Sequence, residues 1–213
     1  MLPPAASAQF SGTFELSPTG CEEKGLCTLT YNLKYEDPKG IEWQADAQDE
    51  TDGASIPPWA QPIIGKPFDS QFIKAAAIHD HYCVRQVRPW RQTHRVFYDA
   101  LLEVGVDDIK AKIMYYAVYL GGPKWVKLTP GKNCGKSCIN SFKSGASAIQ
   151  SRAADYDSTG FTEDLQQVEQ LLIKSNGMIS LGDLEKRAQI KRPNDFYFQN
   201  GDVVETNTGL PTQ

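Results

Sequence analysis

The hydrophobic pattern of this chain changes its period once, and this change constrains the fold more than any other feature. Apolar and polar residues alternate in three early segments, 10–16, 29–35 and 41–47, which is the pattern of half-buried β-strands. From about residue 71 onward, apolar residues recur every three or four positions, as they do on amphipathic helices. The sequence therefore predicts an α+β fold with its strands first and its helices second.

The connections between these segments follow from their turn residues. Asp37-Pro38-Lys39-Gly40 joins the second and third predicted strands, and this order of Pro and Gly is typical of a tight turn. We expect the three strands to form a small antiparallel β-meander at the N-terminus. The run from Thr51 to Pro67 is so rich in Pro and Gly that we expect an ordered loop there, without a helix or a central strand.

The helical pattern predicts a bundle on which the β-meander packs, with additional C-terminal helices. The bundle helices are expected at about 71–86, 90–104 and 108–121, and the C-terminal helices at 162–174 and 180–188. Asp or Ser residues precede most of these segments, where their side chains can cap the first turn of a helix.

These elements divide the chain into five predicted parts. Between the two groups of helices the sequence is polar and rich in Gly, Ser and Lys, which favours a loop, with a weak helix over 141–153 as the alternative. The predicted parts are a signal-peptide remnant or flexible N-terminus (1–9), an α+β domain (10–125), a loop region with a local cysteine pair (126–160), a helical extension (161–192) and a flexible tail (193–213).

The overall composition argues against two classes of protein. The formal net charge is -4 and basic residues are not clustered, whereas binding to nucleic-acid phosphates needs clustered Lys and Arg. No apolar stretch approaches the roughly 20 residues that a membrane-spanning helix requires. We therefore expect no nucleic-acid partner and no transmembrane segment.

The N-terminus and the cysteines indicate an exported protein. Ala6-Ser7-Ala8 fits the small-x-small cleavage pattern of a secretory signal peptide, so we expect a periplasmic or secreted location. Two close cysteine pairs support this, because each is spaced for a local disulfide in an oxidising compartment: Cys21 with Cys27, and Cys134 with Cys138.

The chemistry-bearing residues gather on one predicted helical hairpin. All three histidines, His79, His81 and His94, lie there, and Asp80 follows the first of them. At about 1.5 Å rise per residue, His79 and His94 stand at similar heights on the two facing helices. A histidine pair with a carboxylate is the ligand type of zinc and similar divalent ions, so we predict His79, Asp80 and His94 as metal ligands. His81 points away from His79 and is expected to be exposed.

The loop before the hairpin adds candidate catalytic residues. We predict Asp52, Ser55, His79 and Asp80 as the catalytic set, because a tight loop can direct its carboxylate and hydroxyl onto the helices. Ser55 as a nucleophile is an open alternative, although it lacks the Gly-x-Ser-x-Gly elbow. Cys83 as a nucleophile is another, although a cysteine in the middle of a helix is more often buried and inert.

Two motifs together carry a resemblance to a known family. Thr51-Asp52-Gly53-Ala54-Ser55-Ile56-Pro57 and Ala75-Ala76-Ala77-Ile78-His79-Asp80-His81-Tyr82 resemble the domain-of-unknown-function family numbered 1353, found in phage and bacterial proteins. The resemblance covers about residues 10–125 and implies a shared fold and site. The chain departs from the family at Thr93-His94, where an Ala-Asp pair is usual; Asp and His are both metal ligands.

The hypothesis that follows is an exported metal-assisted hydrolase. A divalent ion such as Zn²⁺ would activate water for attack on a cell-envelope amide, peptide or ester bond. The alternative is a non-enzymatic envelope or secretion-associated binding protein, in which the His-Asp motif is a buried structural network. The C-terminal helices add the prediction of a protein partner, against the simpler interpretation that their apolar faces pack on the chain's own core.

Overall fold

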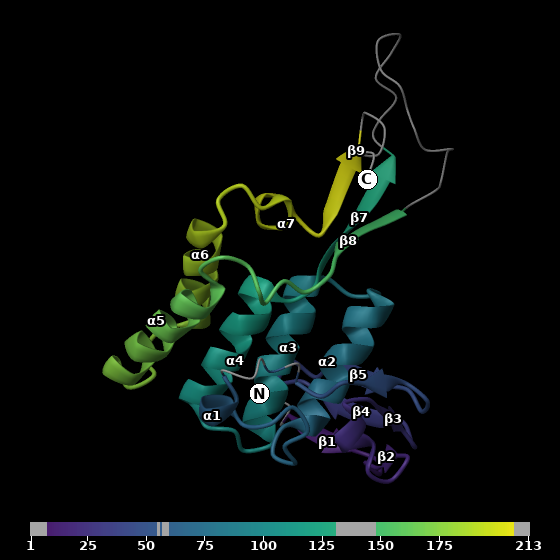
Figure 1. Cartoon of the computed structure of the whole chain (residues 1–213). Helices are drawn as coiled ribbons and strands as arrows, with labels where there is room; N and C mark the ends of the chain where they lie inside the picture. Colours follow the sequence, from purple (N-terminus) through teal and green to yellow (C-terminus); the bar gives the residue numbers. More distant parts are fainter. Residues whose placement is uncertain (1–7, 55, 57–59, 131–147, 207–213) are drawn as a thin grey trace, which may run out of the picture.

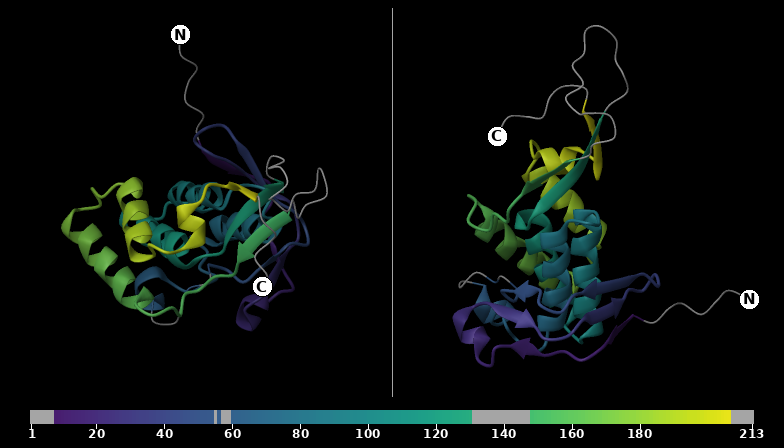
Figure 2. Two further views of the ribbon diagram at one scale, coloured as in Figure 1. Left: turned by 90° about the horizontal axis from the view of Figure 1, so that it is seen from above. Right: turned by 90° about the vertical axis from the view of Figure 1, so that its right-hand side faces the viewer.

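The computed structural model describes residues 8–54, 56, 60–130 and 148–206. Two small antiparallel sheets from the N-terminal third lie across one end of a group of helices, and a third sheet from the C-terminal half lies at the opposite end (Figure 1). The right-hand view in Figure 2 shows the same order along the long direction of the molecule. The α+β class predicted from the change of period is confirmed.

The N-terminal strands form two three-stranded sheets where one meander was predicted. The antiparallel pairing is confirmed, but the first two predicted strands each divide between the sheets. Gly12, at φ +94°, and a bend at 30–31 interrupt them. One sheet has the order β1-β4-β5 and the other β2-β3-β6, with β1 at Gln9–Ser11, β2 at Leu16–Ser17, β3 at Cys27–Leu29, β4 at Leu33–Glu36, β5 at Glu42–Ala45 and β6 at Glu50–Thr51.

Local links hold these short strands in place. A 3₁₀ turn, η1 at Cys21–Lys24, connects β2 to β3, and the Cys21–Cys27 disulfide closes it, as one of the two predicted pairs required. The predicted β4–β5 turn is also present. Its Asp37 carboxylate accepts hydrogen bonds from the backbone of Lys39 and Ile41 and from the buried indole of Trp43.

The helical bundle agrees closely with its predicted limits. It consists of α2 at Ile73–Arg85, α3 at Trp90–Glu103 and α4 at Asp108–Gly121, whose N-cap Asp107 accepts from two backbone amides. The prediction that the Thr51–Pro67 run contains no helix was wrong for one turn, α1 at Gln61–Ile64. This turn is compatible with its proline, because the first turn of a helix does not use those backbone N–H groups.

The C-terminal half contains strands that the sequence pattern did not indicate. The predicted loop region, 126–160, contains most of β7 at Lys124–Pro130 and all of β8 at Ala148–Arg152, and the predicted flexible tail contains α7 at Phe196–Gln199 and β9 at Val203–Thr206. β7 pairs antiparallel with β8 and parallel with the distant β9. Such pairing depends on contacts between remote segments, which a local pattern does not report. Cys134 and Cys138 lie outside the described residues.

Two further helices, α5 at Phe161–Lys174 and α6 at Leu181–Lys191, pack against α4. The apolar face of α5 is buried in the common core through Leu165, Val168 and Leu172. The simpler interpretation of this amphipathic helix is therefore confirmed for that face, and the protein partner stays a prediction. Among the described helices, none has the length and the apolar character needed to cross a membrane.

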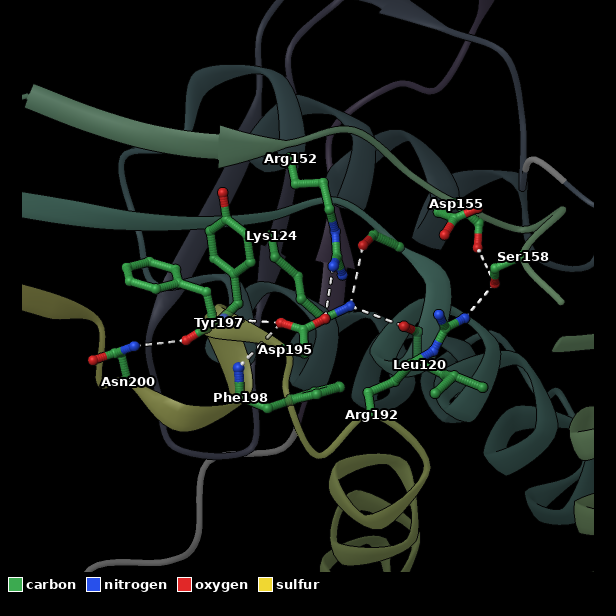
Figure 3. Close-up of polar contacts among 12 residues, drawn as sticks. Leu120, Lys124, Arg152, Asp155, Ser158, Arg192, Asp195, Tyr197, Phe198 and Asn200 are labelled. Carbon is green, nitrogen blue, oxygen red and sulfur yellow. Dashed lines mark hydrogen bonds and ion pairs between the residues drawn. The ribbon is translucent and has the colours of Figure 1, made fainter. Parts of the chain in front are cut away.

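The C-terminal segment encloses a lysine at the end of the bundle. Lys124 is completely buried, and its Nζ donates to the carbonyls of Leu120 at 3.0 Å and Gly122 at 3.3 Å. Figure 3 shows this ammonium group beside the Arg152–Asp195 ion pair. Burial lowers the pKa of Lys124 to about 7, and the charge of Arg152 adds to this effect. Neutral Lys124 is thus accommodated by the fold near neutral pH.

The buried lysine predicts a specific pH dependence of stability. The pKa of Lys124 is about 7 in the folded chain and about 10.4 in an unfolded one. Between these values the unfolded state binds one more proton, so the free energy of unfolding rises with pH. Relative to Lys124→Met, it should rise by about 2 kcal/mol from pH 7 to pH 9 in urea titrations. A constant difference between the two proteins across this range would contradict the assignment.

Candidate functional site

The α2–α3 hairpin brings His79 and His94 into direct contact. Gln86 ends α2 in the left-handed region at φ +53°, and Pro89 precedes α3, so the two helices reverse direction within a short turn. Nε2 of His79 lies 2.8 Å from Nδ1 of His94. The predicted approach of these two side chains across the hairpin is therefore present.

The proton positions of this pair follow from its surroundings. Nε2 of His94 lies 3.0 Å from the carbonyl oxygen of Pro123, which can only accept, so this nitrogen carries a proton. The His94 ring is completely buried, and burial lowers its pKa well below the usual value, with the charges of His79 and Lys124 adding to the effect. In neutral His94 the Nδ1 atom is an acceptor, so Nε2 of His79 donates to it. With that proton on Nε2, Nδ1 of His79 has the lone pair whenever the ring carries a single proton.

Asp80 lies on the other side of the His79 ring. Its Oδ1 is 3.9 Å from Nδ1 of His79, too long for a hydrogen bond, and its Oδ2 accepts from the Thr51 hydroxyl at 2.5 Å. Burial raises the pKa of Asp80, the nearby charge of Asp52 raises it further, and the contacts with His79 and Thr51 oppose this shift. The acidic loop thus reaches the helical site as predicted, and Thr51 is the residue that makes the contact.

Gly53 allows the loop to pass close to the backbone of Pro67. Gly53 has φ +80°, and a Cβ at this position would lie 2.4 Å from the carbonyl oxygen of Pro67. Its backbone N–H donates to the Thr51 hydroxyl at 3.1 Å, and the next amide, of Ala54, donates to Pro67 at 2.9 Å. Only glycine is compatible with both the conformation and the spacing here.

A cavity of about 80 Å³ adjoins His79 and Asp80. It is large enough for a few water molecules, since one water needs roughly 10–15 Å³ by this measure. Cys83 also lines it, with Sγ 3.5 Å from Nε2 and 3.8 Å from Nδ1 of His79. The remaining walls come from the loop, the bundle and the segment after β8: Gly53, Ala54, Ala76, Phe97, Val118, Pro123, Ala154 and Tyr156.

The other predicted site residues are less central. Asp52 is exposed and lines a separate surface groove of about 1020 Å³, although its charge acts on Asp80 and Cys83. Ser55 lies outside the described residues. Cys83 is a free thiol whose pKa is raised well above the usual value by burial and then by the charges of Asp80 and Asp52. A protonated thiol is a weak nucleophile.

His81 is not exposed as the sequence predicted. Only 8% of its surface is accessible, and its Nδ1 lies 2.5 Å from Oδ2 of Asp49, which also contacts Arg85. Burial disfavours the Asp49 charge, but hydrogen bonds from His81 and from the Asp46 backbone outweigh it and lower the pKa of Asp49. The expectation was wrong because the β3–β6 region covers this face of α2, which helical periodicity alone does not reveal.

Two donor arrangements around His79 are relevant to a metal. His79, Cys83 and His94 offer one atom each within 4.8 Å of one another. The two histidine nitrogens of that set already share a proton at 2.8 Å, whereas two ligands of tetrahedral zinc are about 3.3–3.5 Å apart. The other ring nitrogen, Nδ1, lies 3.9 Å from Oδ1 of Asp80, and both residues line the cavity. The structure thus brings His79, Asp80 and His94 together, but on two sides of one imidazole.

The proton positions make a prediction for nuclear magnetic resonance. In metal-free protein near neutral pH, long-range ¹H–¹⁵N correlations of His79 should show the proton on Nε2. His81 is the internal control, because its contact with the Asp49 carboxylate requires a proton on Nδ1. Finding the His79 proton on Nδ1 would contradict the inferred hydrogen-bond direction.

Two curated proteins of Sinorhizobium fredii are similar to this chain, and no solved structure matches it. The uncharacterized protein y4iH is 40% identical over 190 residues, which cover 86% of this chain and 78% of the relative. The uncharacterized protein y4jT is 39% identical over 125 residues, which cover 57% of this chain and 37% of the relative.

The family comparison covers the N-terminal strands from β3 to β6 and most of the helical bundle. The model of the family described as "Protein of unknown function (DUF1353)" matches residues 27–118, which include the loop from Thr51 and the His79–His94 hairpin. Pro123 and Tyr156 lie beyond the matched residues. With this match and the long alignment to y4iH, the resemblance seen in the sequence is confirmed: the chain belongs to the DUF1353 family.

Proposed function

We propose that the chain is a metal-assisted hydrolase of an amide, peptide or ester bond, with its reaction centre at His79 and Asp80. One observation carries this proposal. Nδ1 of His79 and Oδ1 of Asp80 are 3.9 Å apart, both residues line a cavity with room for water, and Nε2 of His79 is already held by His94. An imidazole lone pair and a carboxylate thus share one small space without bonding to each other.

The donor chemistry supports a divalent ion between these groups. An imidazole nitrogen, a carboxylate oxygen and a thiol, the last from Cys83, are donor types that zinc takes in proteins. With bonds of about 2.0–2.2 Å, His79 and Asp80 would approach each other by about half an ångström. A metal-bound His usually donates its other ring N–H to a fixed acceptor, and here that acceptor is His94. In this proposal His94 positions His79 instead of binding the ion.

The reaction uses water as the nucleophile. An ion held by His79 and Asp80 would lower the pKa of a bound water to about 7, so that hydroxide would be available at neutral pH. The hydroxide oxygen would form a bond to the carbonyl carbon, the C–N or C–O bond to the leaving group would break, and the leaving group would take the proton of the attacking hydroxyl. The protonated state of Cys83 argues against a thiol nucleophile at this site.

The proposed location is the cell envelope. Ala6-Ser7-Ala8 fits a signal-peptide cleavage pattern, and the Cys21–Cys27 disulfide suits an oxidising compartment. An envelope amide, peptide or ester is therefore the substrate class we propose.

A non-enzymatic binding protein is the second candidate, because the same contacts form a continuous network. Thr51 binds Asp80, His79 binds His94, and His94 binds the carbonyl of Pro123, so the loop, both helices and the start of β7 are tied together. A buried, satisfied network of this kind can serve stability alone.

Substitution of the two proposed ligands separates these candidates. His79→Ala and Asp80→Asn should each remove zinc binding and lower the hydrolysis of nitrophenyl esters or anilides at least about a hundredfold, because metal activation contributes several kcal/mol. Circular dichroism should show folded variants. Zinc content is measured after chelator treatment and reloading.

His81→Ala is the matched control for this experiment. It removes a histidine from the same helix, but from the side that pairs with Asp49, so metal content and activity should be retained. A native protein that neither binds zinc nor hydrolyses any member of the panel, together with an unfolded His79→Ala variant, would favour the structural network.

A further inference from the structure

The segment after β8 contributes a tyrosine to the cavity of His79 and Asp80. Tyr156 lines this cavity, although it stands outside the family-matched residues 27–118. The backbone N–H of Asp155 donates to the carbonyl of Gly121 at 2.7 Å. A Cβ on Gly121 would lie 2.9 Å from the Tyr156 ring, so the absence of a side chain there lets the ring pack onto the end of α4. Tyr156 is therefore held at the cavity by α4.

The Tyr156 hydroxyl is suited to donate a hydrogen bond. Within the described part of the chain, no group hydrogen-bonds to it. Burial raises its pKa, and the charges of Cys83, Asp80 and Asp52 raise it further, so the hydroxyl keeps its proton at neutral pH. The Tyr156 hydroxyl is therefore close enough to the proposed metal ligand Asp80 to be affected by its charge.

Tyr156 also borders a second, apolar cavity. This cavity has a volume of about 20 Å³ and shares Ala54, Phe97, Val118 and Tyr156 with the first. By the measure of roughly 10–15 Å³ for one water, it accepts a group about the size of a methyl. The rest of its lining is entirely apolar: Ile56, Ala60, Ile64, Met114, Ala117, Phe161 and Leu165.

We infer that Tyr156 is a further catalytic residue whose hydroxyl binds the carbonyl oxygen of the substrate, and that the apolar cavity receives a short aliphatic acyl group such as acetyl. This inference rests on the proposed hydrolase function. Asp52 and Asp80 disfavour an anionic acyl group near the same position. The substrate class is thus an ester or amide of a short, uncharged acyl group.

The role of Tyr156 in the reaction is that of a hydrogen-bond donor. As hydroxide forms its bond to the carbonyl carbon, the π electrons of the carbonyl move onto its oxygen. Tyr156 donates a stronger hydrogen bond to this oxyanion than to the neutral carbonyl and keeps its own proton. When the carbonyl re-forms, the leaving group departs with the proton of the attacking hydroxyl.

Tyr156→Phe tests this role because it removes only the hydroxyl. We expect kcat for nitrophenyl acetate to fall about 10²–10³-fold, the usual effect of losing one oxyanion donor, with KM and zinc content nearly unchanged. The control is Tyr31→Phe, a tyrosine with 49% of its surface exposed, which should behave as the native protein does. An unchanged kcat, or a loss confined to KM, would overturn the catalytic role.

Ala117→Val tests the acyl cavity, because Ala117 lines the apolar cavity but not the cavity of His79 and Asp80. Relative to uncatalysed hydrolysis, the native protein should prefer acetate over octanoate esters, and the variant should lose activity toward acetate at least about tenfold while retaining it toward formate. Equal loss toward both esters would overturn the acyl assignment.

These experiments distinguish a failure of the inference about Tyr156 from a failure of the hydrolase proposal. If the native protein hydrolyses the esters and Tyr156→Phe matches it, the inference about Tyr156 fails and the hydrolase stands. If the zinc-loaded native protein hydrolyses nothing, the hydrolase proposal itself fails, and this inference fails with it.

Discussion

The hydrogen bond between His79 and His94 is the interaction on which the rest of the candidate site depends. It joins α2 to α3 inside the core, and the second bond of His94, to the Pro123 carbonyl, extends the row to the start of β7. Because His94 is fully buried and neutral, the direction of both of its hydrogen bonds is fixed. The one ring nitrogen left over, Nδ1 of His79, lies 3.9 Å from Asp80, and both residues line the cavity. A structural contact thereby fixes the direction of a reactive lone pair.

Two segments far apart in the sequence line the cavity of His79 and Asp80. In the first, Thr51 bonds to Asp80 while Gly53 lets the loop pass close to Pro67. The second, after β8, packs Tyr156 onto Gly121 at the end of α4. The family-matched residues include the first segment but not the second. The His-Asp motif is therefore only part of the cavity. The C-terminal half supplies another wall, which the motif alone does not predict.

The helices were predictable because their signals are local. Apolar spacing and caps such as Asp107 and Ser180 act within one or two turns, so the limits of α3, α4 and α5 agree with prediction to within a few residues. The C-terminal sheet was missed because β7 pairs with β9, a strand more remote in the sequence than any pattern window reaches. The burial of His81 was missed for the same reason, since Asp49 comes from a separate segment that folds over α2.

By itself, the sequence determined the α+β class, the order of the elements, the turn at Asp37 and the meeting of His79 with His94 across a hairpin. Each of these depends on residues close together in the chain, where helical rise and turn geometry leave few alternatives. Only the tertiary structure decided that His94 faces the side of His79 away from Asp80, and that Tyr156 borders their cavity. Those relations depend on how remote segments pack, and packing in a dense core is settled by the shapes of all its side chains together.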